Sequence, residues 1–491
     1  MRLEDKQLYR DIAKTAVILT AAIFLCRVTK GYFSVVMAVL GIWWAFTNKF
    51  GLALSCYAFF PFLIVLDQGV LPKTPILAIV LRLAPLFIGL VLIITANSRR
   101  GVNRLPFGSL FLYLALAIIS SAGGWAPMIS YMKLINFVLF LIGIWLGTQN
   151  MQERPRDMYV ARTFFLAMVC VLVFGGILAI PFPAISYSTS LGYAEMQSEI
   201  AAAQAIQNLR ESGGVALFSG ITNQSQAFAP ILSCCIAFVL SDMLFVAQRK
   251  MVLHVLLIVA GLIELYMTRS RTGLFSCAVG LMMVLMYVAK QLQVSAAMKA
   301  RIRRMVTTGI AVLIVAGVAS EIANRSITKW IYKANYESDM NGVGFEEALT
   351  STRQGLIELG LDEFRRNPIF GMGFQVNFES YELYGGKGFV LSAPVEKGLL
   401  PIVVIGEGGI AGAVAFIIFL FVFYTECSRR RLRVTIAMFT TFLATNIGEA
   451  TFFSPGGIGG ILWVFSVVGG FMMDSIILGA QRRDYYPQSG F

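Results

Sequence analysis

Two arginines stand close together at positions 269 and 271, in the run Tyr266-Met-Thr-Arg-Ser-Arg-Thr-Gly273. A guanidinium is planar and permanently charged, and its N–H donors match the oxygens of a phosphate. Two such groups beside a Ser and a Thr, close to the start of a helix, would suit the charge and geometry of a pyrophosphate. Arg269 and Arg271 are therefore candidate anion-binding residues.

Other familiar kinds of site are absent from the sequence. It has no Walker A motif and no Gly-x-Gly-x-x-Gly, and Gly342-Val-Gly344 and Gly371-Met-Gly373 lack the strand and helix that such motifs need. No Asp-x-Asp pair or Cys/His cluster could hold a divalent metal. The one histidine, His254, follows two basic residues at a helix end, and we interpret it as an interfacial or packed residue without a role. The sequence therefore predicts neither a metal nor a soluble cofactor.

The composition indicates which elements must position these residues. Of the 491 residues, 57% are hydrophobic and 14% charged, and the mean hydropathy is +0.74. Because no water-soluble domain of this length has that balance, the chain is a membrane protein. Its net charge of +13 could suggest nucleic acid, but the basic residues form short clusters between apolar runs. That distribution is the positive-inside pattern, so we expect membrane lipids and no nucleic acid as partners.

The predicted fold class is all-α, a polytopic bundle of about 14 spanning helices with a long helical periplasmic loop. The predicted segments are 12–29, 32–47, 50–66, 76–96, 107–122, 129–148, 162–180, 226–246, 251–268, 272–289, 305–320, 400–424, 433–449 and 458–479. The division is N-terminal helices (1–180), an outer loop (181–225), central helices (226–320), a large periplasmic loop (321–399) and C-terminal helices (400–491). Within the large loop, residues 345–366 form a predicted amphipathic helix that ends at Asn367-Pro368, with Glu363 off its apolar side.

Basic clusters give the orientation, because Lys and Arg concentrate in cytoplasmic loops. They are Arg99, Arg100 and Arg104; Arg154 and Arg156; Arg249 and Lys250; Lys299, Arg301, Arg303 and Arg304; Arg429, Arg430, Arg431 and Arg433; Arg482 and Arg483. Counting helices places every cluster on the side of the N-terminus. We therefore predict that both termini are cytoplasmic.

Three arginines depart from this pattern. Arg269 and Arg271 fall on the outer side, where they either snorkel to lipid phosphates or form the anion site. Arg82 lies inside the fourth predicted helix, next to Pro85, where a cation is unfavourable unless it is paired or faces a wet cavity. Arg82 could line a polar slot inside the bundle, or it could form a structural pair. The intramembrane carboxylates available to it are Asp242, Glu264, Glu449 and Asp474.

Four stretches on the predicted outer side occur in an order and at a spacing that resemble a known family. They are Phe218-Ser-Gly-Ile-Thr-Asn223; Thr268-Arg-Ser-Arg-Thr-Gly273; Thr352-Arg353 with Asn367-Pro-Ile-Phe-Gly-Met-Gly-Phe374; and Pro394-Val-Glu-Lys-Gly-Leu-Leu-Pro401 with Glu407-Gly-Gly-Ile-Ala-Gly412. Together they resemble the O-antigen ligase and polysaccharide polymerase family of bacterial inner-membrane glycosyltransferases.

The resemblance implies an inverting, metal-independent glycosyltransferase at the periplasmic face. Its donor would be a glycan on undecaprenyl pyrophosphate, and its acceptor either lipid A core or a second lipid-linked glycan. The pyrophosphate-binding residues would be Arg82, Arg269, Arg271 and Arg353. Ligase and polymerase are not distinguished by any motif here.

The sequence departs from the family where relatives carry His-Asn before the helix of the fourth stretch. It reads Glu396-Lys397-Gly398 there, so Glu396 or Lys397 would have to replace the histidine. Glu396 is the candidate base, with Glu407 the next choice, although a solvated Glu396 paired with Lys397 is an equal alternative. A different class of function, a polytopic transporter or lipid-linked glycan flippase, is disfavoured by the long outer loop and by the lack of an internal repeat.

Overall fold

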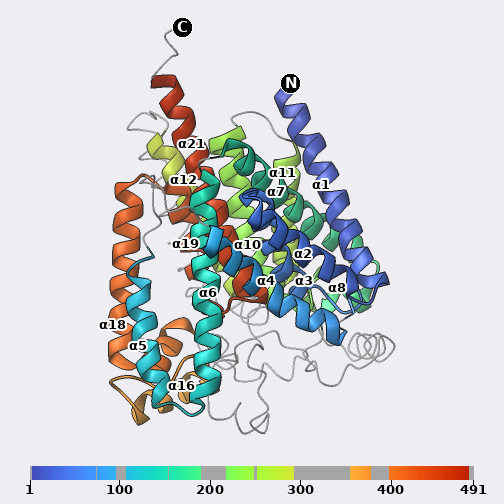
Figure 1. Ribbon diagram of the computed structural model, residues 1–491. Coiled ribbons are helices and arrows are strands. Elements are labelled where there is room, and N and C mark those ends of the chain that lie inside the picture. The colour runs from blue at the N-terminus through green and yellow to red at the C-terminus, as the bar shows by residue number, and fades with distance from the viewer. Residues whose placement is uncertain are drawn as a thin grey trace, which may run out of the picture.

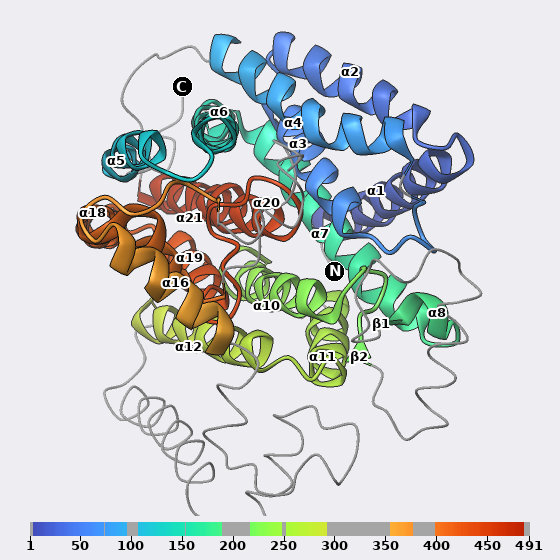
Figure 2. The same cartoon turned by 90° about the horizontal axis from the view of Figure 1, so that it is seen from below.

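The computed structural model describes residues 3–72, 74–95, 107–152, 154–188, 217–247, 252–291, 354–376 and 398–485. In these residues the protein is all-helical apart from one two-residue antiparallel ribbon, in which β1 (Tyr187–Ser188) pairs with β2 (Leu217–Phe218). The helices pack side by side into one bundle (Figure 1), and Figure 2 shows it from the end that carries α16. The predicted fold class is therefore confirmed.

The helices follow the apolar segments of the sequence. They are α1 (Leu3–Val28), α2 (Tyr32–Phe46), α3 (Phe50–Val65), α4 (Pro75–Thr95), α5 (Leu110–Ala122), α6 (Pro127–Gln152), α7 (Pro155–Ala179), α8 (Pro183–Ser186), α10 (Ser225–Ser241), α11 (Val252–Met267), α12 (Arg271–Gln291), α16 (Gln354–Arg366), α18 (Leu400–Arg429), α19 (Arg433–Thr445), α20 (Gly457–Trp463) and α21 (Gly470–Tyr485). Two π-helical segments, Asp242–Ala247 and Val464–Gly469, continue α10 and join α20 to α21. Each predicted span coincides with a helix except 305–320, which lies outside the described residues.

Six helical stretches in the described part of the chain are long and apolar enough to cross a membrane: α4, α6, α7, Ser225–Val246, α18 and Gly457–Gly479. Six further apolar helices are shorter: α2, α3, α5, α11, α19 and Arg271–Tyr287 of α12. The protein is thus a multi-helix membrane protein, whereas a total of fourteen spans stays a prediction.

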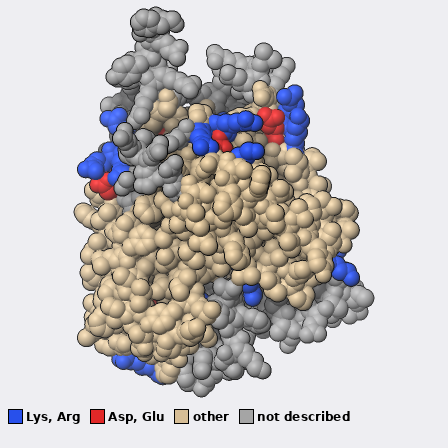
Figure 3. Space-filling model, in the orientation of Figure 1, with Lys and Arg blue, Asp and Glu red and all other residues tan. Residues whose placement is uncertain are grey.

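The start of α1 and the end of α21 lie at the same end of the bundle, as the predicted orientation requires (Figure 1). In the view of Figure 3, many of the Lys and Arg side chains lie near that end, and a broad band with few charged side chains lies below it. The end that carries α16 is the opposite one. Whether this opposite end faces the periplasm stays a prediction.

The interior is built around α10 and the α20–α21 segment, because their side chains are apolar on all sides and are mostly buried. Small residues let α12 approach α10 closely. A Cβ on Gly273 would lie 2.6 Å from the Cβ of Ala229, and the Ser233 hydroxyl donates to the Gly273 carbonyl at 2.7 Å. This contact places the start of α12, which carries Arg271, directly beside α10.

Candidate functional site

A cavity of about 440 Å³ lies between α3, α4, α6 and the connection from α19 to α20. Its lining includes two cations, Arg82 and Lys133, and one carboxylate among the described residues, Glu449. It also includes five side-chain amides: Asn136, Asn223, Gln224, Gln226 and Gln375. The charged residues come from the N-terminal halves of α4 and α6 and from the residues after α19. The cavity therefore lies toward the end of the bundle that is opposite to the termini.

Arg82 faces a cavity with polar side chains, as a cation in an apolar helix requires. It is half-buried, and Pro61 of α3 and Pro85 of α4 line the same cavity. A proline inside a helix has no N–H to donate to the carbonyl four residues earlier. Irregular backbone of this kind is tolerated at membrane depth where it lines a cavity. The two prolines and Arg82 are consistent with one polar recess in the bundle.

The first of the four stretches, 218–223, is joined to the end of α3. The Asn223 amide donates to the Val65 carbonyl at 2.9 Å, and the Asp67 amide donates to the Ile221 carbonyl at 2.9 Å. Thr222 closes the turn by donating its hydroxyl to the Ser219 carbonyl at 2.8 Å. This backbone pairing fixes Asn223 at the cavity wall.

The third stretch forms a loop after α16 that pairs with the backbone of α18. The Met372 amide donates to the Gly406 carbonyl at 2.9 Å, and the Ile410 amide donates to the Pro368 carbonyl at 2.8 Å. Within α18, Gly409 has a φ of 61°, which breaks the helix and frees these backbone groups. A left-handed φ strains residues that carry a Cβ. The glycines of the third and fourth stretches thus allow the backbone of the loop after α16 to approach the backbone of α18 closely.

Serines of α5 and α6 hold the next residues of this loop. The Gly373 amide donates to the Ser120 hydroxyl at 2.9 Å, and the Ser130 hydroxyl donates to the Phe374 carbonyl at 2.8 Å. Lys133 then donates its Nζ to the carbonyl of Gln375 at 3.0 Å. These bonds bring Gln375 and Lys133 to the cavity wall together.

The second stretch is the turn between α11 and α12. The Ser270 hydroxyl accepts from the Gly273 amide at 3.2 Å and caps α12, while Arg269 has a φ of 52°. Arg269 and Arg271 are half-buried and do not line the cavity. The turn is nevertheless close to it, because a Cβ on Gly448, the residue before Glu449, would collide with the side chain of Thr272.

The connection from α19 to α20 completes the site. The Asn446 side chain accepts from the amides of Thr451 at 2.8 Å and Phe452 at 2.7 Å, which fixes the turn that carries Glu449. The Asn446 carbonyl accepts from the Leu400 amide at 3.0 Å, at the start of α18. The described parts of the four stretches therefore lie at this cavity or contact residues next to its wall.

The predicted site residues have different outcomes. Arg82 lines the cavity, and Arg269 and Arg271 lie beside its wall, whereas Arg353, Glu396 and Lys397 lie outside the described residues. The alternative base, Glu407, is buried and does not line the cavity. Lys133 was not predicted, although a Lys within the apolar segment 129–148 is the same signal that singled out Arg82.

One detail of the loop helix was predicted wrongly. Glu363 was expected off the apolar side of the helix, yet it is only 4% exposed and packs against Gly406 of α18. The glycine leaves room for a long side chain at this crossing, so a carboxylate takes an inward position. The helix itself, where it is described (Gln354–Arg366), ends before Asn367 as predicted.

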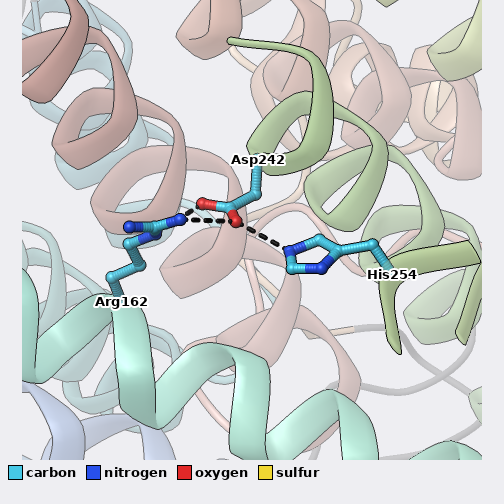
Figure 4. A network of polar contacts seen from close by, with 3 residues as sticks. All are labelled: Arg162, Asp242 and His254. Carbon is cyan, nitrogen blue, oxygen red and sulfur yellow. Dashed lines mark hydrogen bonds and ion pairs between the residues drawn. The ribbon is translucent and has the colours of Figure 1, made fainter. Parts of the chain in front are cut away.

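The carboxylates considered as partners of Arg82 lie in different places. Asp242 accepts two hydrogen bonds from Arg162, at 2.7 and 2.9 Å, and contacts His254 Nε2 at 2.8 Å (Figure 4). Asp474 also lies away from the cavity and accepts from the amides of Val434 and Thr435 at the start of α19. Glu264 lies away from it too and packs against Gly176. Glu449 lines the cavity with Arg82. His254 is completely buried and belongs to the Arg162–Asp242–His254 cluster, away from the cavity.

Comparison with known proteins gives a match to the segment that runs from α11 into α18. No curated protein matches this chain. Residues 256–417 match the family model described as O-antigen ligase. The matched segment contains the second, third and fourth stretches, and it confirms the family resemblance. Residues 256–417 are thus an O-antigen ligase-type segment in a membrane protein.

Proposed function

We propose that this protein is a membrane glycosyltransferase that transfers or polymerises glycans from undecaprenyl pyrophosphate at the periplasmic face of a bacterial inner membrane. The acceptor is either lipid A core, as for an O-antigen ligase, or a second lipid-linked glycan, as for a polymerase. The family match supports the ligase-type activity in its general form. The substrates, the membrane face at which transfer takes place and the reaction mechanism are what we propose.

One observation carries the proposal: the described parts of the family-like stretches lie at or next to a cavity that is lined by two cations inside a membrane bundle. A lipid-linked donor presents its pyrophosphate at the membrane surface, while its prenyl chain stays in the lipid. Cations that line a recess in the bundle, near one of its ends, can reach such a headgroup. Arg82 meets this condition directly. The turn that carries Arg269 and Arg271 packs against Gly448 through Thr272, and we propose that both arginines contribute from there.

The reaction we propose is a single displacement with inversion. The acceptor oxygen attacks C1 of the donor sugar and forms the new glycosidic bond, while the bond from C1 to the pyrophosphate oxygen breaks. The electron pair of that bond leaves with undecaprenyl pyrophosphate, and the hydroxyl proton passes to a base. Glu396 is our candidate base, with Lys397 beside it. The arginines, including Arg353, stabilise the charge that develops on the leaving group, so the reaction needs no metal.

Purified protein tests the proposal directly. Reconstituted in nanodiscs with a lipid-linked glycan, it should release undecaprenyl pyrophosphate and form a new glycan linkage, with or without EDTA. A lipid A core acceptor that gains the glycan indicates a ligase, and lengthening of the lipid-linked glycan indicates a polymerase. Movement of intact donor across a proteoliposome membrane, without transfer to either acceptor, would instead identify a flippase.

Glu396 has its own test in the same assay. General-base catalysis contributes about 10²–10⁴-fold, so Glu396→Gln should slow turnover by roughly that factor and leave donor binding nearly unchanged. Glu426→Gln removes a carboxylate that is paired with Arg429 and Arg430 outside the cavity, and it is the matched control. Turnover within a few-fold of wild type in Glu396→Gln removes this residue from the mechanism.

A further inference from the structure

The polar lining of the cavity is unusual for a site that would bind only an anion. Five of the polar side chains described in it are neutral amides, among them Asn136, Asn223 and Gln226, whereas only two are cations. An amide both donates and accepts hydrogen bonds, and so does a sugar hydroxyl. A pyrophosphate at neutral pH is mainly an acceptor. It could therefore bind the N–H groups of an amide side chain but not its carbonyl oxygen. The lining therefore suits a polyhydroxylated ligand better than a phosphate alone.

Glu449 supports the same conclusion independently. An ionised carboxylate accepts hydrogen bonds and repels a second anion, whereas hydroxyl groups donate to it readily. The residue is half-buried at the cavity wall, in a turn in which its amide donates to the Thr445 carbonyl at 3.0 Å. Its carbonyl accepts from the Thr451 amide at 2.8 Å, so the backbone that carries the carboxylate is fixed.

The apolar part of the lining also fits a sugar ring. Tyr57 and Phe140 both line the cavity, with ring centroids 5.5 Å apart and ring planes at 36° to each other, and provide an aromatic part of its wall. A pyranose has apolar C–H faces as well as hydroxyl edges, and binding sites for small molecules combine aromatic walls with a few polar groups in this way. The volume of about 440 Å³ falls within the range of roughly 300–1,000 Å³ that is usual for such sites.

We propose that this cavity is a saccharide subsite. It holds the donor sugar nearest the pyrophosphate, with Glu449 and the side-chain amides binding its hydroxyls and Arg82 at the pyrophosphate. The inference rests on the proposed function and deepens it, because it names the part of the donor that this cavity recognises. The sugar at the reacting carbon is thereby fixed next to the group that leaves.

Binding measurements with separate pieces of the donor test the inference. The probes are the glycan released from the lipid-linked donor by mild acid and undecaprenyl pyrophosphate without glycan. We expect Glu449→Gln and Asn136→Ala each to weaken binding of the released glycan by about tenfold, because each loses hydrogen bonds to hydroxyls. Affinity for undecaprenyl pyrophosphate should stay within about twofold of wild type, since these residues do not bind phosphate.

Matched variants control for damage to the fold. Asn150→Ala lies on the same helix as Asn136, and its side chain donates only to the Leu146 carbonyl at 2.8 Å. Glu426→Gln controls for loss of a carboxylate. Both should bind the released glycan as wild type does. If Glu449→Gln does not fold, Gln226→Ala at the start of α10 provides a second test.

The outcomes separate this inference from the proposed function. In one outcome, wild-type protein transfers glycan, and the cavity variants bind the released glycan normally but no longer bind undecaprenyl pyrophosphate. The cavity is then a pyrophosphate site, and the inference fails. Unchanged binding of both probes also overturns it. If wild-type protein transfers no glycan and does not bind the released glycan, the proposed function fails together with the inference.

Discussion

Arg82 occupies a position that only a solvated or paired cation can occupy, since it stands inside an apolar helix beside a cavity. A charge-assisted hydrogen bond contributes about 1.5–3 kcal/mol, so Arg82→Ala should lower glycan transfer by roughly 10- to 150-fold. Arg82→Lys should recover only part of the loss, because an ammonium lacks the bidentate geometry of a guanidinium. Initial rates on purified protein measure both variants.

Arg365→Ala is the control for Arg82. Its side chain is 74% exposed on α16, where it forms a surface ion pair with Asp362 at 2.8 Å. It should transfer glycan at the wild-type rate. Equal rates for Arg82→Ala and Arg365→Ala would show that Arg82 is structural and binds no part of the donor.

Asp242 supports a second prediction, this one on stability. Its carboxylate is fully buried and accepts from the guanidinium of Arg162, whose side chain is 12% exposed (Figure 4). Asp242→Asn leaves that guanidinium without its counter-charge, and breaking a buried pair costs about 3–5 kcal/mol of folding free energy. The thermal unfolding midpoint in detergent should therefore fall markedly.

The surface pair gives the matched control for Asp242. Asp362→Asn removes a carboxylate from an exposed pair, which is worth at most about 1 kcal/mol, so its midpoint should hardly change. Equal midpoints for the two variants would mean that the Arg162–Asp242–His254 cluster adds nothing to stability. The cluster was not predictable from the sequence, because Arg162 and Asp242 lie on helices that only tertiary packing brings together.

The break in α18 is a local feature that governs the docking of the third stretch. Gly409 has a φ of 61°, and a Cβ there would collide with the backbone of Ile369. The left-handed conformation alone costs a residue with a Cβ about 1–2 kcal/mol. Gly409→Ala should therefore lower both the thermal midpoint and glycan transfer, because the loop that carries Gln375 would be displaced.

Gly408→Ala separates this strain from a general effect of substituting glycine. A Cβ at Gly408 would lie 3.5 Å from Tyr113 Cε2, an ordinary contact, and the residue has no positive φ. Alanine favours a helix over glycine by up to about 1 kcal/mol, so this variant should be as stable as wild type or more stable. Similar losses in both variants would contradict a specific role for the break at Gly409.

Apolar runs of the right length predicted the helices, because in a membrane the backbone must satisfy its hydrogen bonds within each segment. The same rule does not reveal where a helix is interrupted. The π-helical segments Asp242–Ala247 and Val464–Gly469 and the break at Gly409 depend on packing against neighbours. Likewise, Arg82 was recognisable because a charge stands out in an apolar run, whereas the cavity walls combine residues as distant in sequence as Asn136 and Glu449.

The arrangement of the whole bundle makes the direction of the protein in the membrane testable. The cavity and α16 lie toward the end opposite to the termini, so an outward-facing cavity requires cytoplasmic termini. The seven native cysteines are all buried and should give little background with a thiol reagent. Asp362→Cys on α16 and Ser428→Cys at the far end of α18 place exposed thiols at the two ends.

A membrane-impermeant maleimide added to spheroplasts should label Asp362→Cys at once, and Ser428→Cys only after the membrane is permeabilised. The physical reason is the charge distribution, since the basic residues after α18, Arg429 to Arg431, are held on the cytoplasmic side during insertion. Labelling of Ser428→Cys alone in intact spheroplasts would invert the bundle and turn the cavity toward the cytoplasm. A lipid-linked glycan displayed on the periplasmic leaflet could then not reach Arg82, so this labelling pattern would also exclude the periplasmic transfer that we propose.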